Sequence, residues 1–244
     1  MFQNLMNLPI ASVVAIVAVA GLVRGVTGFG GAMFMAPPLS LLVGPVQAVL
    51  YALFLESIAV LAIIRSIWPR LNPRTLAFVG IPALLSAPVG GLLLTILDAN
   101  IIRYLIATTV VIFSLLLMVG FRYDGPPRGT TSAILGGFSG VLFGATSMGG
   151  PPVILYLLSG PDHHDVTRAN LVAYVSAVSA AALVLPWYGG ALTAAVTLNA
   201  LALAAPYLLG IWLGSHCFSF LSEKLFRRTV LGFMLLSGLV ALLG

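Results

Sequence analysis

Charged side chains are scarce in this chain. Only 7% of its 244 residues are charged, whereas 60% are hydrophobic and the mean hydropathy is +1.13. A soluble domain of this size needs many more polar side chains to cover its surface. This scarcity excludes the soluble globular class and predicts a multi-pass membrane protein.

Cysteine and acidic residues are also rare. The single cysteine, Cys217, excludes an internal disulfide and by itself supplies no metal site. Eleven basic residues outnumber six acidic ones, but most of them lie in short loops between apolar runs. There they orient membrane spans rather than bind phosphates, so nucleic acid is not an expected partner. The N-terminus lacks a basic region and a small-residue cleavage site, so we expect no signal peptide, and nothing in the sequence implies a cofactor.

Ten apolar segments follow one another without a soluble domain between them. They cover residues 8–24, 32–43, 46–64, 76–97, 101–121, 130–143, 151–159, 169–187, 191–213 and 225–243. A helix needs about 20 residues to cross a bilayer, so segments three, four, five, eight, nine and ten are long enough. Segments two, six and seven are short. Because none alternates polar and apolar residues as a membrane barrel must, we predict an all-α polytopic fold.

The loop charges favour one topology. In one interpretation, segments one and two form a hairpin with both ends on one side of the membrane, and segments six and seven form another. Nine of the eleven basic residues then face one side, in the loops with Arg65/Arg70/Arg74, Arg122/Arg128, Arg168 and Lys224/Arg227/Arg228, while Arg103 lies opposite and Arg24 lies at a glycine break. If segments one and six cross fully instead, while segments two and seven only dip into the membrane, the ten loop charges, Arg103 included, divide five to five. The positive-inside rule favours the hairpins and predicts both termini in the periplasm.

Five segments in each half make the repeat an inverted one. The halves are residues 1–122 and 123–244, and the second begins on the opposite side of the membrane from the first. Inverted repeats are typical of secondary transporters. The two short hairpins enter from opposite sides, so we expect their tips to meet near the midplane.

A glycine motif occurs at both predicted tips. "GLVRGVTGFGG" (21–31) and "GVLFGATSMGG" (140–150) share the pattern G-x-x-x-G-x-T-x-x-G-G, 119 positions apart. Non-helical backbone inside a bilayer requires protein or a water-filled cavity around it. Helices that begin after such tips aim free N–H groups and positive dipole ends at a common pocket, which suits a small anion. The alternative is close helix packing through small residues.

We therefore treat the polar and glycine residues of the tips as candidate substrate-binding residues. They are Arg24, Gly25, Thr27, Gly30, Gly31, Gly144, Thr146, Ser147, Gly149 and Gly150. The hydroxyl groups could donate hydrogen bonds, and Arg24 could supply a full positive charge. Arg168 and Asn170, which open segment eight, are two further substrate-binding candidates, and Arg168 either attracts anions along the inward path or only anchors the topology.

Other polar residues lie in or beside the apolar segments. A buried carboxylate is costly, so Glu56 in segment three is either a proton-coupling group or a structural partner of Arg24 or a hydroxyl. We expect Asn199 to hydrogen-bond between helices. "PDHHDVTR", with Asp162, His163, His164 and Asp165, has a metal-like composition without persuasive ligand geometry, so we expect a solvated loop and no metal site.

The repeated motif, followed by "APPLSLLVGP" in the first half and "GGPPVILYLLSGP" in the second, resembles the TauE/SafE family of sulfite exporters over almost the whole chain. The resemblance implies export of sulfite, sulfoacetate or a related organosulfonate across the bacterial inner membrane, and no enzymatic activity. The expected partners are the small anion and the lipid bilayer. The alternatives are a permease or importer for another anion, a metal-using membrane enzyme built on His163 and His164, and a non-transporting scaffold.

Overall fold

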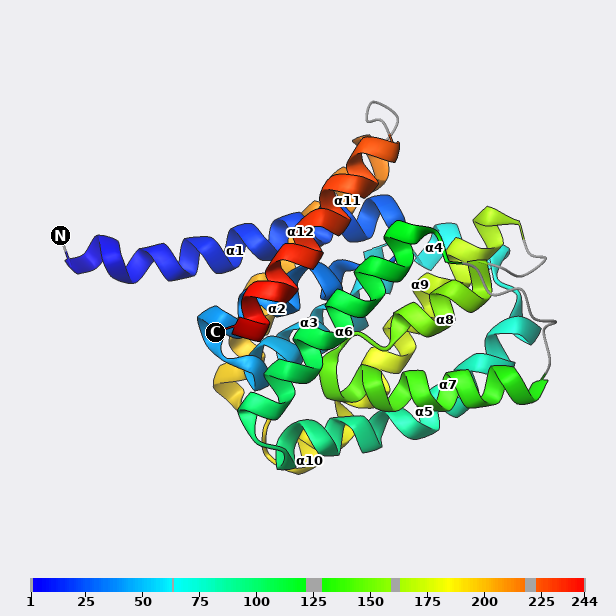
Figure 1. The fold of residues 1–244 in the computed structure, drawn as a ribbon, viewed down its shortest axis with the longest axis horizontal. Helices are drawn as coiled ribbons and strands as arrows, with labels where there is room; N and C mark the ends of the chain where they lie inside the picture. The colour runs from blue at the N-terminus through cyan, green and yellow to red at the C-terminus, as the bar shows by residue number, and fades with distance from the viewer. Residues whose placement is uncertain (1, 63, 122–128, 159–162, 218–222, 244) are drawn as a thin grey trace.

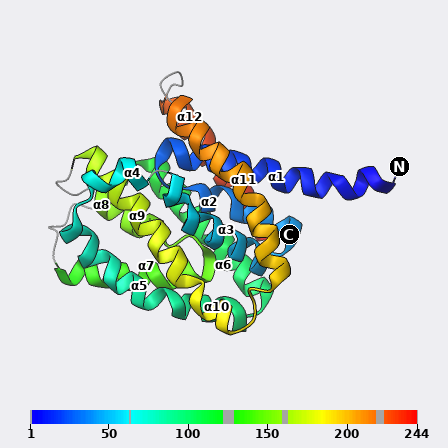
Figure 2. The same cartoon turned by 180° about the vertical axis from the view of Figure 1, so that it is seen from behind.

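All the regular structure in the described part of the chain is helical (Figures 1 and 2). The computed structural model describes residues 2–62, 64–121, 129–158, 163–217 and 223–243. The helices are α1 (Phe2–Thr27), α2 (Gly31–Val43), α3 (Pro45–Ala59), η1 (Val60–Ala62), α4 (Ile64–Ile67), η2 (Trp68–Arg70), α5 (Pro73–Ile96), α6 (Ala99–Val119), α7 (Gly129–Thr146), α8 (Gly150–Leu158), α9 (His164–Ala182), α10 (Val184–Tyr188), α11 (Ala194–Cys217) and α12 (Glu223–Leu243). The all-α prediction is confirmed.

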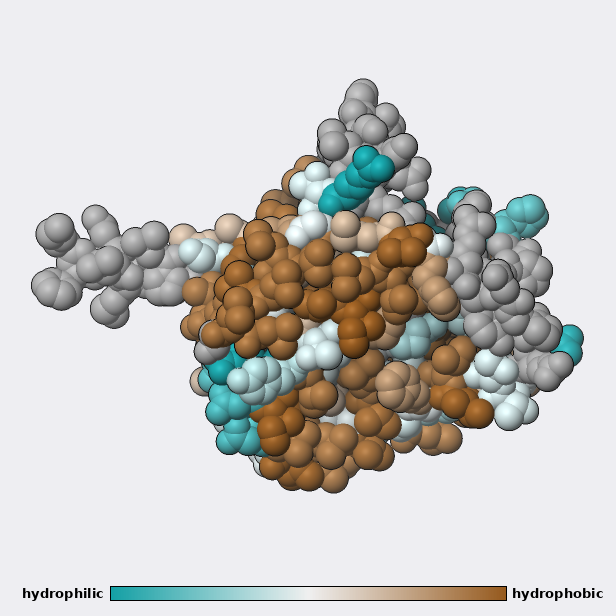
Figure 3. Space-filling model, viewed as in Figure 1, coloured by the Kyte–Doolittle hydropathy of each residue, from teal (hydrophilic) through white to brown (hydrophobic). Residues whose placement is uncertain are grey.

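Several of these helices are suited to a bilayer. Within the described residues, five are long and apolar enough to cross a membrane, over Ile10–Thr27, Pro73–Ile96, Ala99–Val119, Asp165–Tyr188 and Ala194–His216. The molecule exposes many large apolar side chains, and in Figure 3 they form broad brown areas with the hydrophilic residues mostly toward the edges. A surface of this kind is stable against lipid, so the chain is a multi-pass membrane protein.

Two predicted segments differ from the helices observed. The third was expected to be one long helix over residues 46–64, but α3 has 15 residues and ends at Ala59, where 3₁₀ helix η1 follows. At 1.5 Å per residue, α3 is too short to span about 30 Å of hydrocarbon. The first segment was expected to be a short hairpin arm, but α1 has 26 residues. The predicted boundary at 122/123, with Arg122, Arg128 and Asp162, lies outside the described residues.

The helices of the two halves correspond in order and in packing. Helix α1 ends at Thr27 and α2 begins at Gly31, and α7 and α8 repeat these positions 119 residues later, at Thr146 and Gly150. Packing is reciprocal, because α1 contacts α11 while α5 contacts α7, and the pairs α3–α9 and α6–α12 also pack together. Such an exchange of contacts is what a two-fold relation between halves produces, and it favours the predicted repeat.

The chain between α3 and α5 meets the start of α9. The Asn72 N–H donates to Asn170 Oδ1 at 2.9 Å, and Ile67 is buried against Ala169. The basic loop after α3 and Arg168 therefore lie at the same face of the molecule. The hairpin interpretation requires this arrangement, whereas the alternative topology puts the two on opposite faces.

Glycines bring α1 into backbone contact with α11. A Cβ at Gly21 would collide with the carbonyl of Tyr207, and one at Gly25 with the carbonyl of Ile211. The residue numbers rise together on both helices, so α1 and α11 run parallel. Small residues allow membrane helices to pack this closely.

The second glycine contact joins α7 to α5 in the same way. A Cβ at Gly136 would collide with the carbonyl of Val79, and one at Gly144 with the carbonyl of Ala87. These helices are also parallel and lie together in both views, away from α1 and α11 (Figures 1 and 2). We refer to the α1–α11 and α5–α7 contacts as the two glycine seams.

Neighbouring glycines on α7 provide a matched test of the seams. A methyl group at Gly136 meets the backbone of α5, whereas one at Gly137 meets nothing within 4 Å among the described residues. We expect Gly136→Ala to lower the free energy of unfolding by about 1–3 kcal/mol through overpacking. Gly137→Ala should leave it unchanged or raise it by up to about 1 kcal/mol. Thermal unfolding of both variants in detergent measures this, and equal stabilities would contradict the seam.

Candidate functional site

The break between α1 and α2 is made by a threonine and a glycine. The Thr27 hydroxyl donates to the carbonyl of Val23 at 2.8 Å and accepts from the N–H of Phe29 at 3.2 Å. Gly28 has φ +80° and its N–H donates to the carbonyl of Arg24. A left-handed residue cannot continue a right-handed helix, so α1 ends here.

The break between α7 and α8 repeats this arrangement. The Thr146 hydroxyl donates to the carbonyl of Leu142 at 2.7 Å and accepts from the N–H of Met148 at 3.2 Å. Ser147 replaces the glycine, with φ +61°, and is the one non-glycine residue of positive φ in the described part of the chain. Such a conformation is uncommon for serine and marks a position fixed by its surroundings.

These bonds change the interpretation of four candidate residues. Each threonine hydroxyl already donates to the carbonyl four residues before it, so Thr27 and Thr146 act on the backbone of the bends. Gly25 and Gly144 belong to the two glycine seams, which is the packing alternative. We therefore leave these four out of the group that faces a substrate.

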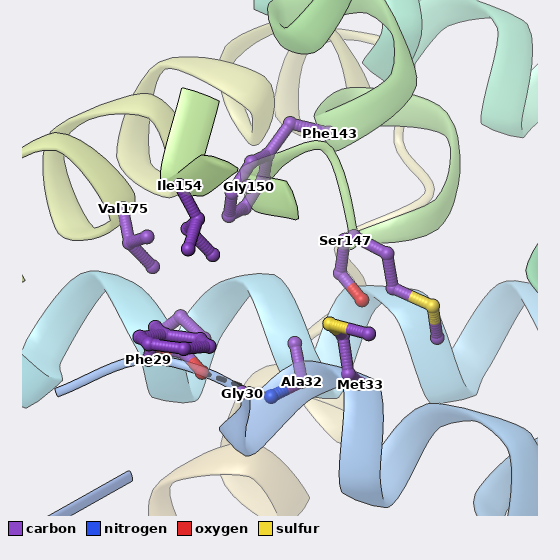
Figure 4. A pocket seen from close by; sticks show the side chains of 11 residues that line it. Phe29, Gly30, Ala32, Met33, Phe143, Ser147, Gly150, Ile154 and Val175 are labelled. Atoms are coloured by element: carbon purple, nitrogen blue, oxygen red, sulfur yellow. Dashed lines mark hydrogen bonds between the residues drawn. The ribbon is translucent and has the colours of Figure 1, made fainter. Parts of the chain in front are cut away.

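The two bends meet at one cavity (Figure 4). Its volume is about 20 Å³, which is room for roughly one water molecule. The lining residues are Phe29, Gly30, Ala32, Met33, Glu56, Phe143, Ser147, Met148, Gly150, Ile154 and Val175. Of the predicted site residues, Gly30, Ser147, Gly150 and Glu56 lie on this lining. The expectation that the tips come together agrees with this geometry, although most of the walls are apolar.

A buried ion pair adjoins the cavity. Arg24 Nε on α1 lies 2.9 Å from Glu56 Oε2 on α3, and the two side chains are 2% and 1% exposed. The other carboxylate oxygen, Oε1, accepts from the N–H of Ala32 at 2.9 Å. Arg24 Nη1 also donates to the carbonyl of Gly28. The pairing of Glu56 with Arg24, one of its two predicted roles, is thus present.

Tyr207 on α11 completes this group, and the sequence analysis missed it. Its side chain is fully buried, and its hydroxyl faces the start of α2, where a Cβ at Gly31 would lie 2.5 Å from it and 2.8 Å from Glu56 Oε1. Gly31 therefore leaves space for two polar groups against the backbone. A tyrosine in an apolar helix is usually a core residue, so the sequence pattern does not single out Tyr207. Only the unusual position of two polar groups against Gly31 could have indicated its role.

The two bends differ in charge. The positions 119 residues after Arg24 and Glu56 are Phe143 and Val175, which are both buried and line the cavity. Helix α8 also begins Gly-Pro-Pro, and the two prolines have no N–H to offer. The groups that attract negative charge are therefore concentrated at the first bend.

Arg168 and Asn170 lie near the first bend but away from the cavity lining. Arg168 Nη2 donates to the carbonyl of Gly25 at 2.7 Å, and its side chain packs against Gly28. A cation at the C-terminus of α1 complements the negative end of the helix dipole. Asn170 is buried and accepts a hydrogen bond from the N–H of Asn72. Arg168 and Asn170 therefore both stabilise the fold.

Two further expectations concern Asn199 and the histidine loop. Asn199 Nδ2 on α11 donates to the Tyr51 hydroxyl on α3 at 3.3 Å, so the predicted interhelical hydrogen bond is confirmed. Among the described residues, no three His, Cys, Asp or Glu side chains gather as metal ligands would. His163 precedes α9 and is exposed to its surroundings.

Broken helices from two halves that meet beside a buried charge are the architecture of secondary transporters. The family described as "Sulfite exporter TauE/SafE" matches residues 13–241, nearly the whole chain. The chain belongs to this family, and it is therefore a membrane protein of a family of sulfite and anion exporters. No curated protein and no solved structure matches it.

The bend threonines can be tested as a pair. Each hydroxyl makes two backbone hydrogen bonds, so Thr27→Val and Thr146→Val should each lower the free energy of unfolding by about 1–3 kcal/mol. Thr→Ser at either position keeps the hydroxyl and should lose much less. Thermal unfolding in detergent gives both values. A valine variant of full stability whose anion affinity fell would instead show that the hydroxyl contacts substrate.

Proposed function

We propose that this protein is a secondary transporter that exports a small sulfur-containing anion, such as sulfite, sulfoacetate or a related organosulfonate. It works by alternating access across the bacterial inner membrane, with both termini in the periplasm. The observation that carries the proposal is the single cavity between the two bends, beside the buried cation Arg24.

An anion is the ligand that this group of residues would attract. Intramembrane arginine is rare and usually marks an ion or substrate pathway. The N-terminus of α2 adds the positive end of a helix dipole and its first free amides. Sulfite and sulfonates present several acceptor oxygens, which guanidinium and amide donors bind through charge-assisted hydrogen bonds.

The size of the cavity implies a closed state. With about 20 Å³ of space, the cavity cannot hold sulfite until the bends separate. In this proposal, one opening movement exposes Arg24 and the start of α2 to the cytoplasm, and the opposite movement exposes them to the periplasm. The two bends serve as the inner faces of these openings.

Export is energetically possible without a second ion. An inside-negative membrane potential favours efflux of each negative charge by about 2.3 kcal/mol at 100 mV. Glu56 adds a route to proton coupling, because protonation would release Arg24 from its internal partner. We therefore propose Glu56 as the coupling group, with Arg24 and Tyr207 as the charged and titratable side chains that face it.

The first test is counterflow in liposomes with sulfite, sulfoacetate, sulfate and simple carboxylates. We expect sulfite or a sulfonate to exchange fastest, and preference for a carboxylate would favour the alternative anion permease.

Arg24→Lys keeps the charge and should retain partial exchange, whereas Arg24→Gln should reduce it at least tenfold, equivalent to about 1.4 kcal/mol. Arg74→Gln, in an exposed position at the start of α5, is the control and should exchange normally.

The second test concerns the dependence of transport on pH. With a sulfonate whose charge is constant from about pH 6 to 8, proton coupling through Glu56 predicts a wild-type flux that changes with pH. Glu56→Gln should flatten this profile. Flux measured at several pH values with no imposed gradient distinguishes the outcomes, and an unchanged profile in the variant would exclude Glu56 as the coupling group.

A further inference from the structure

We infer that the Glu56 carboxylate occupies the anion-binding position itself, and that the substrate, an anion with a three-oxygen head group, binds by displacing it. This inference rests on the proposed transport function and assigns the atoms of its site. Glu56 is then an internal competitor of the substrate.

The contacts of Glu56 are those expected of a bound anion. Oε1 accepts from the N–H of Ala32, the second residue of α2, and Oε2 lies 2.9 Å from Arg24 Nε. A helix N-terminus and a guanidinium are the two features with which proteins most often hold small oxyanions. Because α3 places the carboxylate at this point, the Ala32 N–H and Arg24 Nε have a negatively charged partner without a free anion.

One buried donor remains unused by the carboxylate. Arg24 Nη2 has no hydrogen-bond partner among the described residues, although Arg24 is only 3% exposed. Buried polar groups without partners are uncommon in native proteins. The Arg24 side chain packs against Gly31, beside the carboxylate, and the Tyr207 hydroxyl lies at the same point.

The number of oxygens then selects the ligand class. A carboxylate has two oxygens, and here one faces the amide of Ala32 and the other faces Arg24 Nε. A sulfite or sulfonate head group has three oxygens, and the third can accept from Arg24 Nη2. The site is therefore better completed by a pyramidal three-oxygen anion than by its own glutamate, and this difference allows the substrate to replace the side chain.

Another buried residue of α3 provides a matched control. Val49 lies on the same helix as Glu56, is 0% exposed and is not part of the cavity lining. Truncation to alanine removes buried side-chain volume at either position. Only Glu56→Ala also leaves Arg24 and the amide of Ala32 without their anion.

The experiment measures the melting temperature of purified protein in detergent against the concentration of formate, methanesulfonate or sulfite. In Glu56→Ala, each anion should raise the melting temperature in a saturable way, and the two sulfur anions should act at concentrations about tenfold below formate. The wild type should need at least about tenfold more of the same anions, and Val49→Ala should respond as the wild type does. Glu56→Ala combined with Arg24→Gln should lose the response.

Three outcomes would overturn the inference: no saturable effect in Glu56→Ala, an equal effect in Val49→Ala, or formate acting as well as the sulfur anions. If Glu56→Ala does not fold, Glu56→Gln decides by calorimetry, with sulfite binding expected to be at least about tenfold tighter than in the wild type. Unchanged or weaker binding would contradict the inference. A failure of the transport proposal is separate, because it is an absence of anion flux through wild-type liposomes.

Discussion

The ion pair between Arg24 and Glu56 is the constraint on which the first half of the molecule depends. An unpaired charge inside a membrane protein is costly, and removing one partner leaves the other uncompensated. The pair fixes α1 against α3, and the same carboxylate holds the start of α2 through Ala32. Three consecutive helices are thus joined at one point, where α1 breaks. In the proposed function, the anion must rearrange this same buried contact.

The two halves share a backbone design but differ in chemistry. Both bends use a threonine that bonds back to the preceding turn and a residue of positive φ, at the same spacing. Phe143 and Val175 then stand where the first half has its charges. An apolar wall opposite a charged one keeps the local dielectric low, so the attraction between Arg24 and an anion is screened less than it would be in water. The two similar bends supply the scaffold, and the few side chains that differ place the charges at the first bend.

Much of this arrangement was predictable from periodicity, composition and a repeated motif. The apolar segments, the two breaks and the link between Glu56 and Arg24 follow from the cost of polar groups in lipid, which is readable in a sequence. Tyr207 was not predictable, because a tyrosine within an apolar helix resembles any core aromatic. Nor could the motif alone separate Gly25, which packs against α11, from Gly30, which lines the cavity. That separation depends on which helix lies opposite, and one sequence does not specify a partner helix.

The glycine seams have a consequence for how such a protein moves. Each seam joins a helix of one half to a helix of the other, α1 to α11 and α5 to α7, with backbones in direct contact. Backbones in direct contact resist sliding, so we expect the two helices of each seam to move together as one rigid body. The moving parts of the proposed transport cycle are then two bodies, each assembled from both halves of the chain. A widening between the two seams would open the space where the bends face each other.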